Sequence, residues 1–412
     1  MKDWKKLTSN QRIERVQQAL HENVNFMHDI SLGYPASKLD GKVFYDDAPF
    51  LKDAPVLMTY VANPNHIGCH TTGTSETAFK GTQEMEREVL DIVAVDIFKS
   101  AKKQYDGYIA TGGTEANIQA LWIYRNFFQN TQQAKLAEIM IVASEDTHYS
   151  IAKGANLLSL DLMKVEVDFE TRRILDNELE TLLCKAIADG KKYFIVVANM
   201  GTTMFGSVDN PDTYTQLLEK YNVPYKLHID AAYGGFVYPF IAPDSTLDFA
   251  NKKVSSITID AHKMLQAPYG TGIFLCRKNL IENVLTKEAE YVEGMDLTLC
   301  GSRSGANAIA AWMILTTYGE NGWFEKVKIL QLRTDWICKQ LDALGIAYFR
   351  EPYMNIVTIK AAYIPTEIAH KYDLVPQKHN ADNQWYKIVL MEHVEVDSLH
   401  HLIEDLKKLI LI

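Results

Sequence analysis

A chain of 412 residues, 47% of them apolar, can bury a large core, and its length favours two or three domains. The net charge of −10 and the lack of a basic block argue against nucleic acid as a partner. No apolar run suggests a signal peptide or a membrane span, and the five cysteines form no metal-binding pattern. These features favour a cytoplasmic protein in a reducing compartment, with no metal site and no membrane partner.

The N-terminal part is predicted to contain an amphipathic helix followed by irregular chain. Apolar residues repeat at helical spacing over 10–27, and residues 33–64 are rich in proline and glycine. A polar loop then carries His66 and His70. A helix would bring the two imidazoles together at a metal, but the intervening Gly68 disfavours a helix. A turn, a metal pair and part of a substrate pocket therefore remain open.

The middle of the chain alternates strand-like apolar runs with helical runs, after a predicted helix over 77–98. The predicted strands are 108–111, 139–143, 163–167, 194–199, 227–230, 257–260 and 272–276. Most are continuously apolar, which suits strands buried between two layers of helices. The elements predicted after Gly305 are two helical runs, strands at 355–359 and 387–391, and a final helix over 398–411. The sequence therefore predicts an α/β fold followed by a smaller C-terminal unit.

Candidate chemistry lies where the predicted strands end. Lys263 follows one strand, where it would point into the crevice in which such sheets bind ligands, lose its solvation and form a Schiff base. A solvated lysine in a surface loop is the alternative. Asp230 ends another strand and could hold the ring nitrogen of a pyridine cofactor in its protonated form, or simply cap a helix. Ala232 is small enough to lie flat under such a ring.

A third motif, Gly112-Gly113-Thr114, lies between a predicted strand and a predicted helix. Such a turn offers a phosphate the N–H groups of a helix start, a hydroxyl and no obstructing Cβ. The helix dipole contributes only about 0.3–2 kcal/mol, so direct charge-assisted hydrogen bonds must supply most of the affinity. Many strand-to-helix turns look like this one, so the motif alone is weak evidence for a phosphate site.

Further motifs complete the set in chain order: Asp146-Thr-His148, Gly201-Thr-Thr203, His228-Ile-Asp-Ala-Ala, Asp260-Ala-His-Lys263 and Cys300-Gly-Ser302-Arg303-Ser-Gly305. Together they resemble the group II pyridoxal-phosphate (PLP) decarboxylases of fold type I. The middle of the chain is most similar to archaeal tyrosine/aspartate decarboxylases, and Leu32-Gly-Tyr-Pro35 to PLP-dependent histidine and serine decarboxylases. The resemblance covers nearly the whole chain and is specific for fold and cofactor, but not for substrate.

This resemblance implies a mainly parallel seven-stranded sheet with helices on both faces and a small α+β C-terminal domain. It divides the chain into an N-terminal helix and arm (1–60), a large PLP-binding domain (61–299) and a small domain (300–412). In the family the N-terminal segment lies across the partner subunit. The resemblance therefore also implies a homodimer.

The resemblance also implies site roles. Lys263 would hold the cofactor, Asp230 its ring nitrogen, and His148 would stack on the ring opposite Ala232. Thr203 would lie near the phenolic oxygen and the substrate carboxylate. From the residues alone, His148 could instead cap a helix, and Thr203 could be an ordinary hydroxyl cap. The phosphate ligands implied are Gly113, Thr114 and His262, with Ser302 of the same or the other subunit.

Tyr291 lies in a polar stretch, residues 278–299, that resembles a mobile family loop reaching a neighbouring active site. Its spacing before Gly301 matches a loop tyrosine of the resembling histidine decarboxylases. A phenol on a closing loop can deliver the proton that is needed once carbon dioxide has left. The alternative is an exposed residue whose ring only packs.

The expected reaction is α-decarboxylation of an aromatic, acidic or histidine-like L-amino acid to its amine and carbon dioxide. Cysteine desulfurases also carry a His-Lys pair, and Cys300 could then carry a persulfide. Sphingosine-phosphate lyases share the phosphate motif and the lysine but act on a long-chain phosphorylated substrate. A binding module without activity would not need a Schiff-base lysine. The Gly-Ser-Arg-Ser-Gly motif fits decarboxylases better than desulfurases.

Overall fold

The computed structural model describes residues 80–410, apart from 243, 289–293 and 381, together with residues 10, 30, 32, 33, 40, 42 and 43. Three predicted features lie outside the described residues: the N-terminal helix, the loop with His66 and His70, and Tyr291. Within the described part of the chain, no helix combines the length and apolar character that a membrane span requires.

Seven strands form a large sheet in the order β1-β7-β6-β5-β4-β2-β3. The strands are β1 (Tyr105–Ala110), β2 (Ile139–Ser144), β3 (Asp161–Val165), β4 (Tyr193–Asn199), β5 (Tyr225–Asp230), β6 (Val254–Asp260) and β7 (Gly272–Arg277). β7 runs antiparallel to its neighbours β1 and β6, and the other pairs are parallel. The predicted mainly parallel seven-stranded sheet is confirmed.

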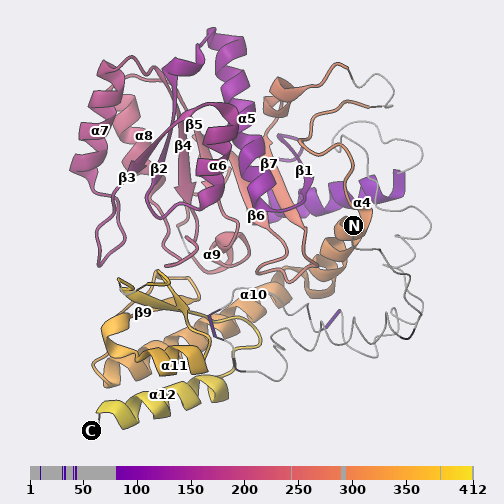
Figure 1. Cartoon of the computed structure of the whole chain (residues 1–412). Helices are drawn as coiled ribbons and strands as arrows, with labels where there is room; N and C mark the ends of the chain where they lie inside the picture. The colour runs from indigo at the N-terminus through magenta and orange to yellow at the C-terminus, as the bar shows by residue number, and fades with distance from the viewer. Residues whose placement is uncertain are drawn as a thin grey trace, which may run out of the picture.

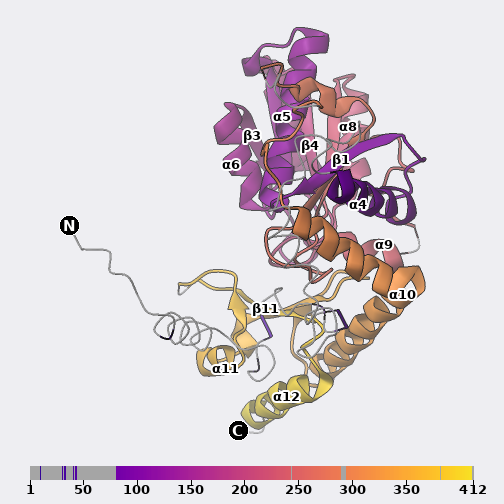
Figure 2. The same ribbon diagram turned by 90° about the vertical axis from the view of Figure 1, so that its right-hand side faces the viewer.

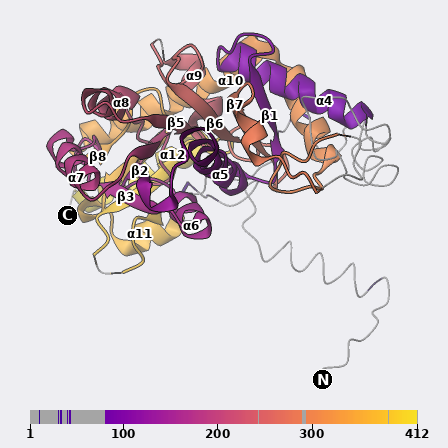
Figure 3. The same cartoon turned by 90° about the horizontal axis from the view of Figure 1, so that it is seen from above.

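Helices cover both faces of this sheet (Figure 1). The helices are α4 (Lys80–Asp91), η2 (Ile92–Ile97), α5 (Gly113–Gln132), α6 (Tyr149–Leu158), α7 (Asp176–Ala188), α8 (Pro211–Lys220), α9 (Tyr238–Ile241) and α10 (Gly305–Ala343). Shorter turns are η3 (Leu136–Glu138), η4 (Gly234–Phe236) and η5 (Leu280–Val284). Seen from above, α5 and α6 lie on one side of the sheet and α4 and α8 on the other (Figure 3).

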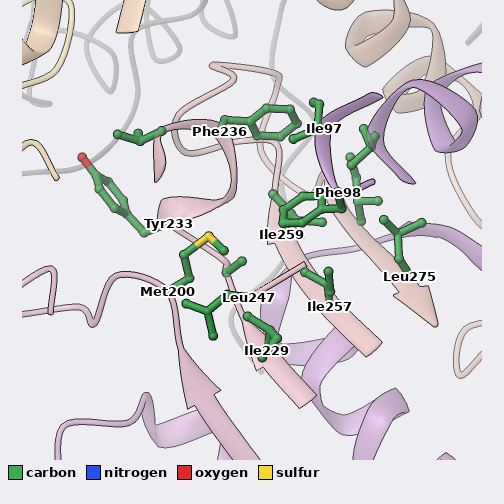
Figure 4. Close-up of a cluster of buried hydrophobic side chains, with 14 of the residues drawn as sticks. Ile97, Phe98, Met200, Ile229, Tyr233, Phe236, Leu247, Ile257, Ile259 and Leu275 are labelled. Atoms are coloured by element: carbon green, nitrogen blue, oxygen red, sulfur yellow. The ribbon is translucent and has the colours of Figure 1, made fainter. Parts of the chain in front are cut away.

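Alternate side chains of one strand enter two different cores, as the continuously apolar sequence predicted. In β4, Ile195 and Val197 pack with α5 and α6, whereas Phe194, Val196 and Ala198 pack on the opposite face. Figure 4 shows the second core, where isoleucines of β5 and β6 meet aromatic side chains from the loops. The sheet is thus a rigid, doubly covered platform.

A second, antiparallel sheet has the order β10-β11-β9-β8. Its elements are β8 (Tyr348–Phe349), β9 (Ile356–Lys360), η6 (Ala361–Tyr363), α11 (Thr366–Lys371), β10 (Val375–Pro376), β11 (Trp385–Val389) and α12 (Val396–Ile410). The long helix α10 runs from the large sheet to this small one (Figure 2). Its last turns, with Ile337, Cys338 and Leu341, pack with α11, α12 and the small sheet in a separate core. The predicted small α+β unit is present.

Candidate active site

One pocket lies at the carboxyl ends of the parallel strands, beside the small sheet. Its lining residues are His148, Asn199, Gly201, Thr202, Thr203, Asp230, Ala232, Tyr233, Lys263 and Ile356. His148, Thr203, Asp230, Ala232 and Lys263 were all candidates from the sequence, and they follow or end four different strands. Parallel strands end at the same edge of a sheet, so residues distant in sequence converge there.

Asp260, the last residue of β6, links the pocket lysine to the glycine turn. Its Oδ2 lies 3.0 Å from Nζ of Lys263, and its Oδ1 accepts a hydrogen bond from the backbone N–H of Gly113. Gly113 is the first residue of α5, so an anionic oxygen occupies the N-terminus of that helix. A Cβ at Gly113 would lie only 2.7 Å from Oδ2 of Asp260. The turn therefore accepts an anion because it lacks a side chain.

The other predicted phosphate ligands differ in where the structure puts them. A Cβ at Gly112 would lie 3.6 Å from Cε1 of His262, so that imidazole sits beside the turn. Nδ1 of His262 donates to the carbonyl oxygen of Thr271 at 3.2 Å. Thr114 is half-buried in the first turn of α5, whereas Ser302 is exposed and is not among the pocket-lining residues. Gly113 is thus linked to Lys263 through Asp260, and His262 lies beside the glycine turn.

Asp230 is buried at the end of β5 and accepts two hydrogen bonds. The backbone N–H of Ala232 donates to Oδ1 at 3.1 Å, and Nδ2 of Asn117 donates to Oδ2 at 2.8 Å. Both partners are donors, which suits an ionised carboxylate. The Asn117 amide belongs to the glycine-turn motif, but its role was missed because its partner lies far away in sequence.

His148 caps α6, one of its two predicted roles, and it also lines the pocket. The backbone N–H of Ser150 donates to Nδ1 of His148 at 3.3 Å, and Oγ of Ser150 lies 2.9 Å from the same atom. Burial is the main cause that lowers the pKa of His148. The site therefore presents a neutral imidazole with its proton on Nε2.

Lys387 of β11 is a functional candidate that sequence reasoning missed. Its ammonium donates to the carbonyl oxygen of Thr203 at 3.0 Å, and the side chain is 4% exposed. Burial, and then the positive charge of Lys263, lower the pKa of Lys387 to about 8. The available signal was strand parity, because Lys387 shares a face with Trp385 and Val389, which are both buried.

Cys300, the candidate persulfide carrier of the desulfurase alternative, is partly buried. Burial, and then the neighbouring Glu115 carboxylate, raise the pKa of this thiol. The thiolate is the reactive form of cysteine, so a raised pKa disfavours nucleophilic sulfur chemistry here.

Known proteins match this chain over nearly its whole length. Residues 65–343 match the family described as the pyridoxal-dependent decarboxylase conserved domain. A tryptophan decarboxylase of Clostridium sporogenes is 53% identical over 99% of this chain and 98% of its own. A probable L-tyrosine/L-aspartate decarboxylase of Methanocella arvoryzae is 32% identical over 87% and 95%. The crystal structure of L-methionine decarboxylase from Streptomyces sp. 590 superposes with a TM-score of 0.80 at 20% identity, covering 98% and 96%.

Fold, pocket and relatives define a PLP-dependent enzyme of fold type I. The chain belongs to the pyridoxal-dependent decarboxylase family. It is a lyase that uses PLP to release carbon dioxide from an L-amino acid. The resemblance identified from the sequence motifs is thereby confirmed.

Proposed function

We propose that the substrate is an aromatic L-amino acid, and tryptophan in particular. The observation that supports this is the 53% identity, over 99% of the chain, to a relative named tryptophan decarboxylase. The relative named for tyrosine and aspartate stands at 32%. Tyr233 and Ile356 form an apolar side of the pocket, which would suit a flat aromatic ring.

The test is a comparison of amine formation from tryptophan, tyrosine, phenylalanine, aspartate and histidine by the PLP-loaded enzyme. Tryptophan should have a kcat/KM at least about tenfold above that of the others, which is about 1.4 kcal/mol of preferential transition-state binding. Equal or better turnover of aspartate or histidine would contradict the aromatic assignment. Carbon dioxide release, measured in parallel, reports decarboxylation whichever amine forms.

The pocket residues fit the cofactor as follows. Lys263 would hold its aldehyde carbon, Asp230 would face its ring nitrogen, and His148 and Ala232 would flank the two ring faces. Thr203 would lie near the phenolic oxygen and the substrate carboxylate. When bound, PLP supplies a protonated ring that takes up the electron pair of the broken bond. The proposed phosphate ligands are Gly113, Thr114, His262 and Ser302.

This placement predicts that Lys263→Ala loses the visible absorption band of bound cofactor that borohydride removes. Lys153, an exposed lysine of α6 beside Tyr149, offers a matched control. Lys153→Ala should keep the band. Retention of a borohydride-sensitive band in Lys263→Ala would assign the covalent attachment to another lysine.

Tyr291 is proposed to protonate the substrate carbon after carbon dioxide has left. The support is its spacing before Gly301, since its position lies outside the described residues. Tyr291→Phe keeps the ring and removes the hydroxyl, so amine formation should fall by roughly 10²–10⁴-fold. Amine production within about threefold of wild type would leave the residue only a packing role.

We also propose a cytoplasmic homodimer whose active sites use residues of both chains. Each chain would consist of an N-terminal arm, a large domain and a small domain, with boundaries at about residues 60 and 300. Tyr149 and Tyr269 are each 64% exposed, although their rings lie beside His148 and His262 at the site. Such exposed aromatic rings at a pocket favour a protein partner. The four cysteines of the described chain are free thiols, which fits a reducing compartment. Light scattering under assay conditions tests the dimer, and an active monomer would contradict it.

A further inference from the structure

Five buried polar side chains form a connected set at the interface between α5 and the large sheet. They are Tyr124, Ser256, His228, Asn117 and Asp230, none more than 5% exposed. Asn117 and Tyr124 are two helical turns apart on one face of α5. His228 and Asp230 share one face of β5, and Ser256 of β6 is paired with His228 in register. Three elements of secondary structure, α5, β5 and β6, thus hold the set in line.

Each member of the set bonds to the next. The hydroxyl of Tyr124 donates to Oγ of Ser256, which lies 2.6 Å from Nδ1 of His228. Nε2 of His228 is 3.0 Å from Oδ1 of Asn117. Nδ2 of Asn117 then donates to Oδ2 of Asp230 at 2.8 Å. The five side chains form one continuous hydrogen-bond chain that ends in the pocket.

The chain has a single direction. Nδ2 of Asn117 uses its donors on Asp230 and on Oγ of Ser150, at 2.9 Å, so its Oδ1 must accept from Nε2–H of His228. Burial lowers the pKa of His228 to about 4, which leaves the imidazole neutral and makes Nδ1 an acceptor for the hydroxyl of Ser256. Every donor therefore points towards the carboxylate of Asp230.

We propose that this chain positions Asp230 and stabilises its negative charge opposite the cofactor's ring nitrogen. A second branch runs from Asn117 through Ser150 to Nδ1 of His148, so one amide also orients the imidazole proposed for the ring face. Tyr124, Ser256 and His228 touch no pocket space and act only through Asn117. The inference rests on the proposed placement of PLP, because Asp230 needs a ring nitrogen to face.

The physical consequence concerns where the proton between ring nitrogen and carboxylate resides. Donors aimed at Asp230 stabilise the anion and make it less basic, so the proton stays on the ring. A broken chain leaves a more basic carboxylate and lets the proton move away from the ring nitrogen. If His228 served packing alone, its replacement would not change the position of this proton.

The experiment uses PLP labelled with ¹⁵N in the ring, bound to the full-length enzyme. In Ser256→Ala and His228→Leu, the ¹⁵N chemical shift should move towards that of an unprotonated pyridine. We expect kcat to fall roughly tenfold to hundredfold, as for one lost hydrogen bond to a charge, with KM within about threefold. His228→Gln retains a donor for Oδ1 of Asn117, so its ¹⁵N chemical shift and its kcat should both lie close to those of the wild type.

Thr258 offers a matched control, two residues from Ser256 on the same face of β6. It is fully buried, and among the described residues its hydroxyl has no hydrogen-bond partner. Thr258→Val should therefore leave the ¹⁵N shift and kcat unchanged. An equal change in Thr258→Val and Ser256→Ala would mean that packing alone matters, and would overturn the proposal.

Asp230→Asn separates the two levels of the argument. If this variant fails to move the ¹⁵N shift, the proposed placement of the cofactor is wrong. If it moves the shift while folded Ser256→Ala and His228→Leu do not, the placement stands and the chain has no such role. Circular dichroism of each variant establishes folding, and Ser256→Ala serves if His228→Leu does not fold.

Discussion

The charge of Lys387 is the residue-scale feature with the most direct consequence for activity. Its buried ammonium donates to the carbonyl oxygen of Thr203. Burial and the positive charge of Lys263 lower its pKa to about 8. The group is therefore charged at neutral pH and neutral above pH 9. A positive charge in a buried site attracts the carboxylate of an incoming amino acid.

We expect kcat/KM of the parent enzyme to decline above about pH 8 as Lys387 loses its proton. Lys387→Met keeps the length of the side chain and removes the charge, so kcat/KM at pH 7 should fall by roughly tenfold. Lys387→Arg retains the charge at all these pH values and should abolish the decline near pH 8. A pH–rate series on the three proteins checks this, and an unchanged decline in Lys387→Met would exclude the lysine as its cause.

The sequence identified residues whose chemistry shows in their position along the chain. Lys263, Asp230 and His148 follow or end strands, and the edge of a parallel sheet brings such positions together. Asn117 lies in the glycine-turn motif and Lys387 on the buried face of its strand, but neither local pattern shows which partner the side chain meets. Their roles come from partners that lie far away in the sequence and meet them only in the folded chain.

At the scale of elements, α10 contains one break. Gly319 has φ 60° and ψ −178°, a backbone conformation that side-chain-bearing residues adopt only under strain. Residues on both sides of it, as far as Leu330, pack in the core of the large sheet, and only the last turns pack in the core of the small sheet. The helix therefore changes its course at Gly319, before it leaves the core of the large sheet.

Two glycines of α10 should respond to alanine with opposite signs. Gly319→Ala has room for the Cβ but not the backbone freedom, so the free energy of unfolding should drop by about 1–3 kcal/mol. A Cβ at Gly322 would only touch Tyr318 at an ordinary 3.6 Å. Gly322→Ala should therefore stabilise the helix by about 0.5–1 kcal/mol. Urea unfolding measures both, and equal effects would deny Gly319 a special role.

The sequence predicted secondary-structure elements correctly where a local apolar pattern marks them. It failed where pairing with a neighbouring strand determines the bounds or direction of a strand. All seven strands of the large sheet were found, but β1 begins three residues earlier than predicted, because polar Asp106 and its neighbours pair with β7. The two-residue strands β8 and β10 carry too little pattern to be recognised. The reversed direction of β7 has no local signature, since strand direction depends on the connection and the partners.

At the scale of the whole molecule, two buried groups oppose each other in acid. Burial raises the pKa of Asp209 from 3.8 to about 6, and lowers that of His228 from 6.5 to about 4. Between pH 3.8 and about 6, Asp209 is protonated in the folded protein but ionised in the unfolded chain, so its contribution to stability falls as pH rises. Between about pH 4 and 6.5, His228 is protonated in the unfolded chain but neutral in the folded protein, so its contribution to stability falls as pH drops.

The two contributions to the pH dependence of the free energy of unfolding nearly cancel between about pH 4 and 6.5. Removal of either group should therefore reveal the pH dependence that the other one causes. Asp209→Asn keeps an oxygen for the two hydrogen bonds from Asn199, and should lose about 3 kcal/mol relative to wild type between pH 6.5 and 4. His228→Gln should gain a similar amount over the same interval. Urea unfolding at both pH values tests this. Two variants with the same pH trend as wild type would refute it.

The reversed strand β7 also determines how firmly Lys263 is held. Because β7 runs against β6, Asp260 at the end of one strand pairs directly with Gly272 at the start of the other. The short connection that carries Lys263 is closed by backbone hydrogen bonds, from Lys263 to Asp260 and from His262 to Thr271. A parallel connection would have needed a long crossover instead.

The amide hydrogens of residues 262, 263 and 267 should consequently exchange with solvent deuterium only when the centre of the sheet opens. Mass spectrometry of peptides should show them exchanging nearly as slowly as β6, and far more slowly than the exposed turn at residues 169–171. Rapid exchange at these amides would show that the loop opens by itself. Slow exchange would mean that local fraying cannot displace Lys263, and that the enzyme keeps this lysine in place for as long as it stays folded.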